Sequence, residues 1–335
     1  MKQPLVSILI PFKNTELFLK ECLDSIVQQE YQNWEVQAVD DASTDDSYKI
    51  VSKYAEKDPR FNVLKNSGNG IIEALRTGFK ECKGELITRM DSDDIMAPDK
   101  LGTLLELLLN SGKGHVAVGQ VKYFSHRGIS DGYARYEQWL NKLTAEGNNY
   151  SEIYKECAIP SPCWMVFKED LLQCGAFEPN RYPEDYDLTF RYYENGLTCI
   201  PCQKVLHYWR DYDTRTSRTS EHYAANYFLD IKLHYFLKLE YDPTRPLVIW
   251  GAGNKGKTIA KTLLEKKIDF KWICDNPKKI NKDIYGIKLD HYRILNHLQD
   301  AQNIITVANE KEQETIKSFF TVLNKTPMKD YFFFC

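Results

Sequence analysis

Acidic residues form two close groups within the first hundred residues of the chain. Asp40 and Asp41 come directly after the apolar segment WEVQAV. Asp91, Asp93 and Asp94 follow the segment ELITRM in the same way. Carboxylates at Asp91 and Asp93, with one residue between them, can both reach a single cation from a short loop. Hard oxygen ligands select Mg²⁺ or Mn²⁺, which bind one or two protein carboxylates and fill their other positions with substrate phosphates. The spacing therefore predicts a divalent-cation site for a phosphorylated substrate.

An isolated pair of this kind also occurs as a solvated acidic turn that caps a helix, here the helix expected over residues 98–109. Three further features favour a functional site over that alternative. They are the earlier acidic pair, Arg76, and a later set of Glu184, Asp185 and His207.

Alternating strand and helix patterns must position these acidic residues. The short apolar runs VSILI, WEVQAV and ELITRM predict buried strands, and apolar residues at helical spacing between them predict helices. Repeated strand–helix–strand units indicate an α/β fold with a mostly parallel sheet and helices on both faces. In such open sheets ligands bind beyond the carboxyl ends of the strands, where both acidic groups stand.

Composition excludes several other classes of protein. The chain has 335 residues, and at about 150 residues per domain it should form about two domains. Its 44 Lys and Arg residues against 47 Asp and Glu give a net charge of −3, so nucleic acid is not an expected partner. No run of about 18 apolar residues predicts a membrane-spanning helix. Nine scattered cysteines, an odd number, indicate a reducing, cytoplasmic compartment.

A domain boundary is expected at YDPTRP, where two prolines follow an aromatic helix that ends near residue 241. We expect a first domain over residues 1–240 and a small Rossmann-like α/β domain over residues 246–335. The second domain opens with the pattern strand, glycine turn, helix.

That glycine turn is a GxGxxG motif formed by Gly251, Gly253 and Gly256, and Asp275 follows roughly 20 residues later, at the end of the next strand. Glycines at these positions let backbone N–H groups approach a phosphate at a helix N-terminus. The segment also resembles the small nucleotide-sugar-binding domain of bacterial sugar O-acyltransferases. Three interpretations remain open: a structural domain, a nucleotide or nucleotide-sugar site, and an NAD(P)-binding redox module.

Five segments resemble, in order, the characteristic blocks of bacterial family 2 glycosyltransferases: VSILIPFKN, VDDASTDDS, KNSGNGIIEALRTG, GELITRMDSDD and PEDYDLTFRYYENG. They lie within residues 4–218. The resemblance implies a GT-A fold, a nucleotide-diphosphate sugar donor (a UDP-sugar), Mn²⁺ or Mg²⁺, and inversion at the anomeric carbon. It further implies a glycan or lipid-linked glycan acceptor in surface polysaccharide biosynthesis.

The resemblance assigns nucleotide contacts to four residues. Pro11 and its neighbours would line the base, and Asp41 would accept a hydrogen bond from the uracil N–H. Arg76 stands where the family has an arginine near the base and diphosphate. The chain departs from the family at Lys13, where a tyrosine is usual, and Phe12 is expected to supply the missing stacking surface.

The resemblance also assigns the metal site. Asp91 would meet the ribose or the metal, and Asp93 would bind the metal directly. His207 lies in the string IPCQKVLH, which is similar to the segment of polypeptide N-acetylgalactosaminyltransferases that supplies a third metal ligand. A packed histidine without a ligand role is the alternative.

Inverting sugar transfer needs one general base to take the proton of the acceptor hydroxyl. Glu184 and Asp185 match the ED motif of the family, so Asp185 is the expected catalytic base. Pro183 followed by two acidic residues is also typical of the first turn of a helix, and both interpretations can hold together.

Two alternatives from other classes stay open: a nucleotide-sugar-binding or regulatory protein without catalysis, and an NAD(P)-binding module in the second domain. The complete set of acidic motifs argues against the first. A lipid-linked acceptor would bring the chain to the inner face of the membrane as a peripheral protein, where the terminal YFFFC and the aromatic helix at 222–241 would help. Core packing explains both segments more simply, and a homo-oligomer also stays open.

Overall fold

The computed structural model describes residues 3–215 and 228–335, and the contacts among them divide the chain into two units. Unit 1 comprises the chain up to Asn149 together with Ala158–Arg215. Unit 2 comprises Tyr150–Cys157 and the chain beyond residue 215. The division thus differs from the one that the prolines predict, because a short earlier segment and the aromatic helix both join unit 2.

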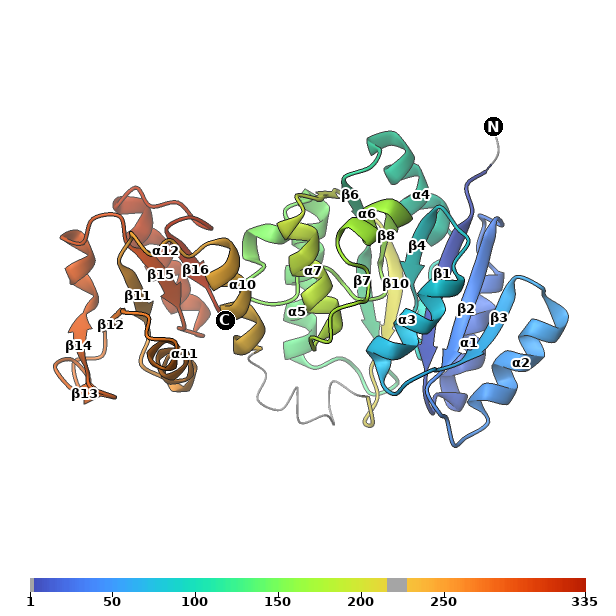
Figure 1. Cartoon of the computed structure of the whole chain (residues 1–335), viewed down its shortest axis with the longest axis horizontal. Helices are drawn as coiled ribbons and strands as arrows, with labels where there is room; N and C mark the ends of the chain where they lie inside the picture. The colour runs from blue at the N-terminus through green and yellow to red at the C-terminus, as the bar shows by residue number, and fades with distance from the viewer. Residues whose placement is uncertain (1–2, 216–227) are drawn as a thin grey trace. The chain divides into compact units, whose positions relative to one another are not determined.

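A seven-stranded sheet forms the centre of unit 1, in the order β3-β2-β1-β4-β8-β6-β9 (Figure 1). Its strands are β1 (Val6–Phe12), β2 (Trp34–Asp40), β3 (Phe61–Lys65), β4 (Leu86–Arg89), β6 (His115–Val118), β8 (Trp164–Phe167) and β9 (Thr198–Ile200). The first four strands are parallel, whereas β8 runs antiparallel to both β4 and β6. This confirms the expected α/β fold with a mostly parallel sheet.

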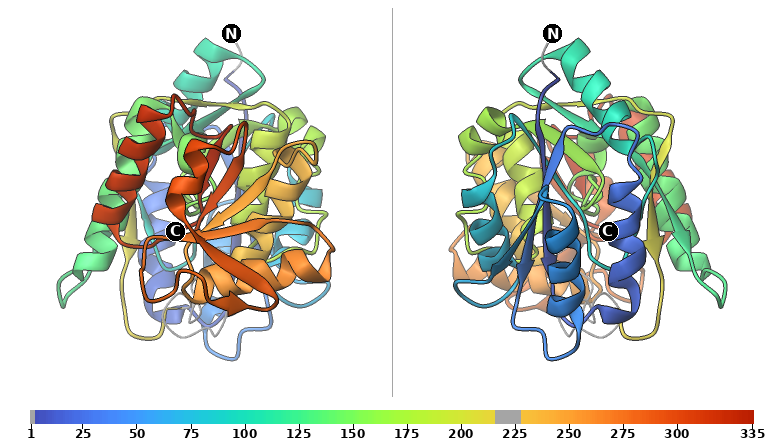
Figure 2. Two further views of the ribbon diagram at one scale, coloured as in Figure 1. Left: turned by 90° about the vertical axis from the view of Figure 1, so that its left-hand side faces the viewer. Right: turned by 90° about the vertical axis from the view of Figure 1, so that its right-hand side faces the viewer.

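Helices cover both faces of that sheet. The helices of unit 1 are α1 (Glu16–Val27), α2 (Ser47–Lys57), α3 (Ile71–Glu81), α4 (Lys100–Ser111), α5 (Asp131–Glu146), which packs on the second sheet of the unit, α6 (Lys168–Gln173) and α7 (Glu184–Glu194). A short 3-10 turn, η1 (Asn149–Glu152), leads into the Tyr150–Cys157 segment of unit 2. Ile8 and Ile10 of β1 face the core that α1 and α4 close, whereas Leu9 faces α3. Figure 2 (right) shows α1 and α3 on opposite sides of the strands. Alternation along one strand therefore sorts its apolar side chains between two helical layers.

A second, three-stranded sheet in unit 1 joins β5 (Ile95–Met96), β10 (Val205–Arg210) and β7 (Gln120–Phe124). Strand β10 pairs antiparallel with β5, where His207 lies opposite Met96, and parallel with β7. Because β5 begins directly after Asp94, this pairing brings β10 against the acidic turn from a point more than a hundred residues away in sequence.

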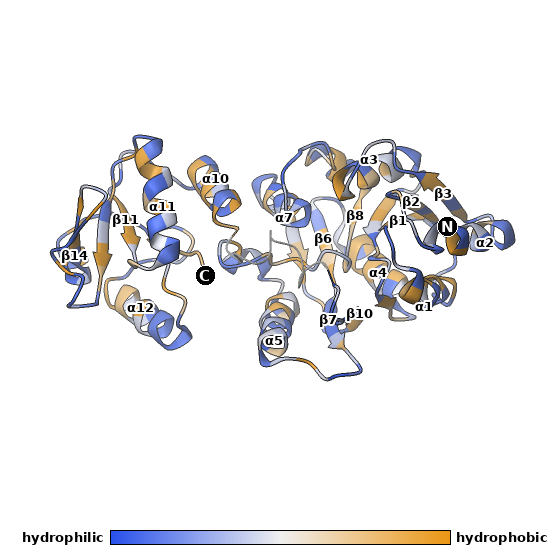
Figure 3. Cartoon of the chain, turned by 90° about the horizontal axis from the view of Figure 1, so that it is seen from below, coloured by the Kyte–Doolittle hydropathy of each residue, from blue (hydrophilic) through white to orange (hydrophobic). Residues whose placement is uncertain are grey.

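Unit 2 contains a six-stranded sheet in the order β13-β14-β12-β11-β15-β16. Its elements are α10 (Leu229–Leu239), β11 (Leu247–Trp250), α11 (Asn254–Glu265), β12 (Lys271–Cys274), β13 (Asp283–Ile284), β14 (Ile287–His291), η2 (Tyr292–Asn296), β15 (Gln302–Ile305), α12 (Glu310–Val322) and β16 (Tyr331–Phe333). All its strand pairs are parallel except β13 with β14. This is the strand order of a doubly wound, Rossmann-type sheet, and α11 and α12 lie on its opposite sides (Figures 1 and 3).

Aromatic packing explains why Tyr150–Cys157 belongs to unit 2. The Tyr154 ring stacks on Phe334 with centroids 5.5 Å apart, and it meets Phe236 and Phe332 edge-on. The terminal YFFFC segment is thereby largely buried, so core packing accounts for its aromatic residues. Within residues 3–215 and 228–335, no helix has the length and apolar character that crossing a membrane requires.

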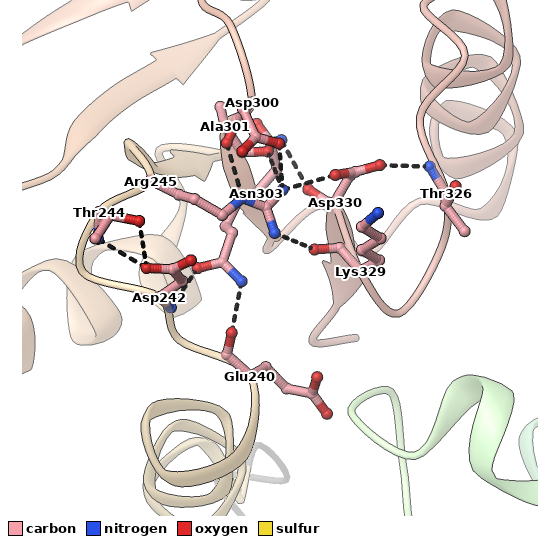
Figure 4. A network of polar contacts seen from close by, with 11 residues as sticks. Glu240, Asp242, Thr244, Arg245, Asp300, Ala301, Asn303, Thr326, Lys329 and Asp330 are labelled. Carbon is pink, nitrogen blue, oxygen red and sulfur yellow. Dashed lines mark hydrogen bonds and ion pairs between the residues drawn. The ribbon is translucent and has the colours of Figure 1, made fainter.

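The link between α10 and β11 is held by Arg245 (Figure 4). Its guanidinium pairs with Asp330 at 2.6 Å and with Asp300 at 3.2 Å, and its side chain is only 11% exposed. Gln302 adds two bonds to the same link: its amide nitrogen donates to the Glu240 carbonyl at 2.6 Å, and its amide oxygen accepts from the backbone N–H of Asp242 at 2.8 Å. The buried arginine therefore fixes the start of the unit 2 sheet.

Candidate active site

The turn after β4 brings three carboxylates together at the carboxyl end of the central strands. Asp94 is fully buried, and the side chain of Asp91 is 22% exposed. Burial, with the charges of Asp94 and Asp91, raises the pKa of Asp93 to about 7. Carboxylates this close resist ionising together, and a divalent cation would relieve that repulsion. The donor set therefore fits Mg²⁺ or Mn²⁺.

No group of three or more His, Cys, Asp or Glu side chains is arranged to hold a metal ion within the described parts of the chain, 3–215 and 228–335. Mg²⁺ usually keeps only one or two protein carboxylates beside water and substrate phosphates. Asp91 and Asp93 can supply that number from one turn.

His207 is fully buried beneath this turn, and both of its ring nitrogens have partners. Nε2 lies 2.9 Å from Asp94 Oδ2, and Nδ1 lies 3.2 Å from Lys100 Nζ. Because the Lys100 ammonium only donates, Nδ1 accepts and Nε2 carries the proton toward Asp94. Burial and the Lys100 charge lower the pKa of His207, so the ring is neutral. Both ring nitrogens of His207 thus contact protein side chains, those of Asp94 and Lys100, and its role as a third metal ligand stays a prediction.

The segment after β10 covers Asp93. The Tyr212 hydroxyl donates to Asp93 Oδ2 at 2.8 Å, and its ring packs on Phe18 with centroids 4.5 Å apart. Arg210 donates from Nε to the Asp93 carbonyl at 2.7 Å and from its backbone N–H to Asp94 Oδ1 at 2.8 Å. No local pattern in the sequence indicates Tyr212, because the pairing of β10 with β5 brings this segment to the turn.

Arg89, the last residue of β4, is a further residue that the sequence analysis missed. Its side chain is only 7% exposed and contacts two carboxylates. Nη2 and Nε lie 2.9 and 3.1 Å from Asp91 Oδ1, and Nη1 lies 2.9 Å from Glu184 Oε1. One guanidinium thus joins the acidic turn after β4 to the first residue of α7.

Asp185, the predicted base, follows Glu184 in the first turn of α7, as the pattern of proline and two acids predicts. Burial and the Glu184 charge raise the pKa of Asp185 to about 7, against the opposing effect of Arg89. A carboxyl group that ionises near neutral pH is suited to accept a proton from a substrate.

Asp41 lies at the carboxyl end of β2, where the nucleotide was expected. Its Oδ1 accepts from Asn66 Nδ2 at 2.7 Å and from the backbone N–H of Gly70 at 2.9 Å. Lys13 Nζ lies 3.2 Å from Oδ2. The lysine that replaces the usual tyrosine of the family therefore pairs with the predicted uracil-binding carboxylate.

Two other expected nucleotide contacts have different surroundings. Phe12 is only 2% exposed and packs in the core of unit 1, which corrects the expectation that its ring faces the base. Pro11, one residue earlier on β1, is partly exposed beside Val39. Alternation along the strand places Phe12 on the same buried face as Ile10.

Arg76 on α3 holds a neighbouring segment of unit 1. Nε donates to the Phe177 carbonyl at 2.7 Å, and Nη2 donates to Asn180 Oδ1 at 2.7 Å and to the Glu178 carbonyl. Nη1 pairs with Glu73. Each guanidinium nitrogen of Arg76 thus has a protein partner, and the structure does not bring it to the acidic turn.

In unit 2, packing accounts for two of the three glycines in the predicted ligand site. A Cβ on Gly256 would lie 2.1 Å from the Gly251 carbonyl oxygen, and one on Gly251 would lie 2.5 Å from Thr306 Oγ1. Gly253 has no atom within 4 Å of the corresponding position, and Asp275 is exposed after β12. A ligand site here therefore rests on Gly253 and Asp275 alone and stays a prediction.

We expect Gly256→Ala to lower the free energy of unfolding of unit 2 by about 3 kcal/mol. The new Cβ would clash with the Gly251 carbonyl oxygen, which is a backbone atom and cannot move away as a flexible side chain could. Gly253→Ala is the matched control: at φ −84° and ψ −170° an alanine fits, and its stability should stay within about 0.5 kcal/mol of the parent. Chemical unfolding of the full chain measures both. Equal losses from the two substitutions would contradict a packing role for Gly256.

The fold and the site define a class. A mixed sheet with carboxylates after the two parallel strands that flank β1, and a further acidic pair at a helix start joined to them through Arg89, is the arrangement of GT-A glycosyltransferases. Residues 7–175 match the family model described as "Glycosyl transferase family 2". The chain belongs to this family and has a GT-A fold.

Relatives and solved structures agree with this assignment. Glycosyltransferase GlyA of Streptococcus pneumoniae is 28% identical over 61% of this chain, and a chondroitin synthase of Pasteurella multocida is 30% identical over 61%. These matches span 30% and 21% of the relatives' own lengths. Residues 1–349 of Staphylococcus aureus TarS with UDP-GlcNAc give a TM-score of 0.56 at 21% identity, over 77% of this chain and 71% of that one. The mannosyltransferase PcManGT of Pyrobaculum calidifontis, with GDP-Man and Mn²⁺, gives 0.53 at 20% identity, over 71% and 64%.

Proposed function

We propose that the chain transfers a sugar from a UDP-sugar to a hydroxyl group of a glycan or lipid-linked glycan, with inversion at the anomeric carbon and with Mg²⁺ or Mn²⁺. The observation that carries the proposal is the placement of the α7 carboxylates beside the acidic turn. Glu184 is tied to Asp91 through Arg89, and Asp185 is the next residue of the same helix turn.

Different residues of the chain have different roles in an inverting transfer. Asp185 accepts the proton of the acceptor hydroxyl while the hydroxyl oxygen forms its bond to the anomeric carbon. The bond from that carbon to the diphosphate breaks, and its electron pair leaves with the diphosphate oxygen. Asp91 and Asp93 would hold the divalent cation, which when bound would neutralise the charge on the leaving diphosphate.

Asp41 supports a uridine donor. A carboxylate oxygen at the carboxyl end of β2 can accept the imide N–H of uracil, and its position is fixed by Asn66 and the backbone N–H of Gly70. The complexes of TarS with UDP-GlcNAc and of PcManGT with GDP-Man and Mn²⁺ support a nucleotide-sugar donor and a divalent metal for this chain as well.

A screen of nucleotide sugars, each with Mg²⁺ and then with EDTA, tests the proposal. We expect one UDP-sugar to release UDP in the presence of metal only. Release of no nucleoside diphosphate from any donor would instead favour a binding or regulatory protein without catalysis. Matches to a chondroitin synthase and to GlyA support glycans as the first acceptors to add.

The activity should fall as the pH drops below neutrality. Asp185 must be ionised to accept a proton, and burial raises its pKa to about 7. The turnover number should therefore decline about tenfold per pH unit below pH 7. Metal and donor are kept at saturating concentrations at each pH. Protonation of Asp93, an expected metal ligand, then does not determine how the turnover number depends on pH. A midpoint near pH 4, the ordinary range of an aspartate, would contradict this account of Asp185.

A further inference from the structure

We infer that Arg89 is a positioning residue that fixes the place of the catalytic base relative to the metal-binding turn. Its guanidinium joins Asp91 to Glu184, and Asp185 is the neighbour of Glu184 in the first turn of α7. Arg89 itself touches neither substrate nor metal in this account. The inference rests on the proposed function, because it explains how that site keeps its geometry.

The contacts of Arg89 use two different edges of its guanidinium. Nε and Nη2 form one edge, and both lie within 3.1 Å of Asp91 Oδ1. Nη1 lies 2.9 Å from Glu184 Oε1. The second oxygen of Asp91, Oδ2, is thereby left for other ligands. A planar, rigid group with donors on two edges fixes the separation of its two partners, whereas the single ammonium of a lysine does not.

Burial makes the bridge a strong constraint. The side chains of Arg89 and Glu184 are 7% and 10% exposed, so either charge without the other would lie largely out of water. Removing one partner of such a pair is much more costly than the net value of the pair, because a buried charge is left behind. The β4 turn and the start of α7 therefore keep one relative position.

That position matters for the reaction. Asp91 belongs to the turn that would hold the leaving diphosphate through the metal, and Asp185 takes the acceptor proton on the other side of the anomeric carbon. A shift of about 1 Å between two such groups can lower a rate about a hundredfold. Arg89 consequently affects turnover more than donor binding.

The test uses Glu184→Gln, Arg89→Met, Arg89→Lys and the Glu184→Gln/Arg89→Met double variant of the full chain. Glu184→Gln removes the ion pair on the α7 side alone and leaves only the weaker amide oxygen as acceptor, so we expect its turnover number to fall about 10- to 100-fold while the donor KM changes less than about threefold. The double variant should lose no more turnover than Arg89→Met, because both changes break one bridge. Arg89→Lys should regain only part of the loss.

Arg245→Met is the matched control. Arg245 is also a largely buried arginine between two carboxylates, Asp300 and Asp330, but it lies in unit 2. We expect it to lower the unfolding temperature and to leave turnover per folded molecule unchanged. The inference would be overturned if the turnover number of Glu184→Gln stayed within twofold of the parent. It would also be overturned if the loss of turnover in the double variant equalled the product of the losses in the two single variants.

Unfolding measurements separate this inference from the proposed function. In a double-variant cycle, the change in the unfolding equilibrium constant of the double variant is compared with the product of the changes in Arg89→Met and Glu184→Gln. The two values should differ by at least about tenfold, whether or not the chain transfers sugar. If the parent chain transfers sugar to no acceptor and not to water, the proposed function fails. The cycle then decides the bridge alone, and multiplicative effects would overturn it.

Discussion

Asp185→Asn should lower the turnover number for sugar transfer by about a thousandfold. An amide keeps the size of the carboxyl group and its place in the first turn of α7, but it cannot accept the proton of the acceptor hydroxyl. Asp185 lies partly buried in the first turn of α7, near Glu184 and Arg89, where the amide would keep these surroundings. Donor affinity, measured by calorimetry with a UDP-sugar and Mg²⁺, should change less than about threefold.

Glu194→Gln is the control for that substitution, because Glu194 is an exposed acid at the other end of the same helix. It should leave turnover unchanged. If Asp185→Asn retained more than a tenth of the parent turnover, the assignment of Asp185 as the base would be wrong.

Asp93→Asn should abolish the response of the enzyme to Mg²⁺ and lower transfer by roughly a thousandfold. Burial and the neighbouring charges of Asp94 and Asp91 raise the pKa of Asp93 to about 7, so this carboxylate would gain from a bound cation. Replacing it removes one of two expected ligands, and the charge on the leaving diphosphate is no longer neutralised. Activity against Mg²⁺ and Mn²⁺ concentration, with Mn²⁺ binding measured by electron paramagnetic resonance, checks both effects.

Asp46→Asn provides the comparison, since Asp46 is an exposed aspartate before α2 that pairs only loosely with Lys49 at 3.7 Å. It should bind Mn²⁺ and transfer sugar like the parent. Unchanged Mn²⁺ binding in Asp93→Asn would contradict the metal site.

Local patterns predicted the parts of the site that are close together in sequence. The run WEVQAV is a strand that ends at Asp40, and Pro183 with its two acids begins α7 as expected. Both signals come from neighbouring residues, which the strand and helix periods order directly. The same alternation could also have placed Phe12 in the core, because it continues the buried face of β1.

Partners distant in sequence could not be predicted in this way. Arg89 meets Glu184 across 95 residues, and Lys100 meets His207 across 107. Such pairs depend on the register of β10 with β5 and on where α7 begins, and no local pattern encodes either. The metal role expected for His207 rests on a resemblance over one short segment and stays a prediction, whereas its contacts with Asp94 and Lys100 come from the fold.

The boundary between the units shows the same limit. Prolines at 243 and 246 mark a real turn, which Arg245 holds in place. Tyr154, however, lies far upstream, stacks on Phe334 and meets Phe236 edge-on. Three-dimensional packing therefore assigned a segment to unit 2 that composition along the chain could not.

The stereochemistry of donor cleavage, followed by ¹H nuclear magnetic resonance with Mg²⁺ and with water as the acceptor, is the most direct test of an inverting transfer. For an α-linked UDP-sugar, a single base opposite the leaving diphosphate predicts that the β-anomer of the free sugar appears first and that the α-anomer grows in only by mutarotation. First appearance of the α-anomer, or cleavage that continues unchanged in EDTA, would contradict an inverting, metal-dependent transfer by Asp185 and the acidic turn.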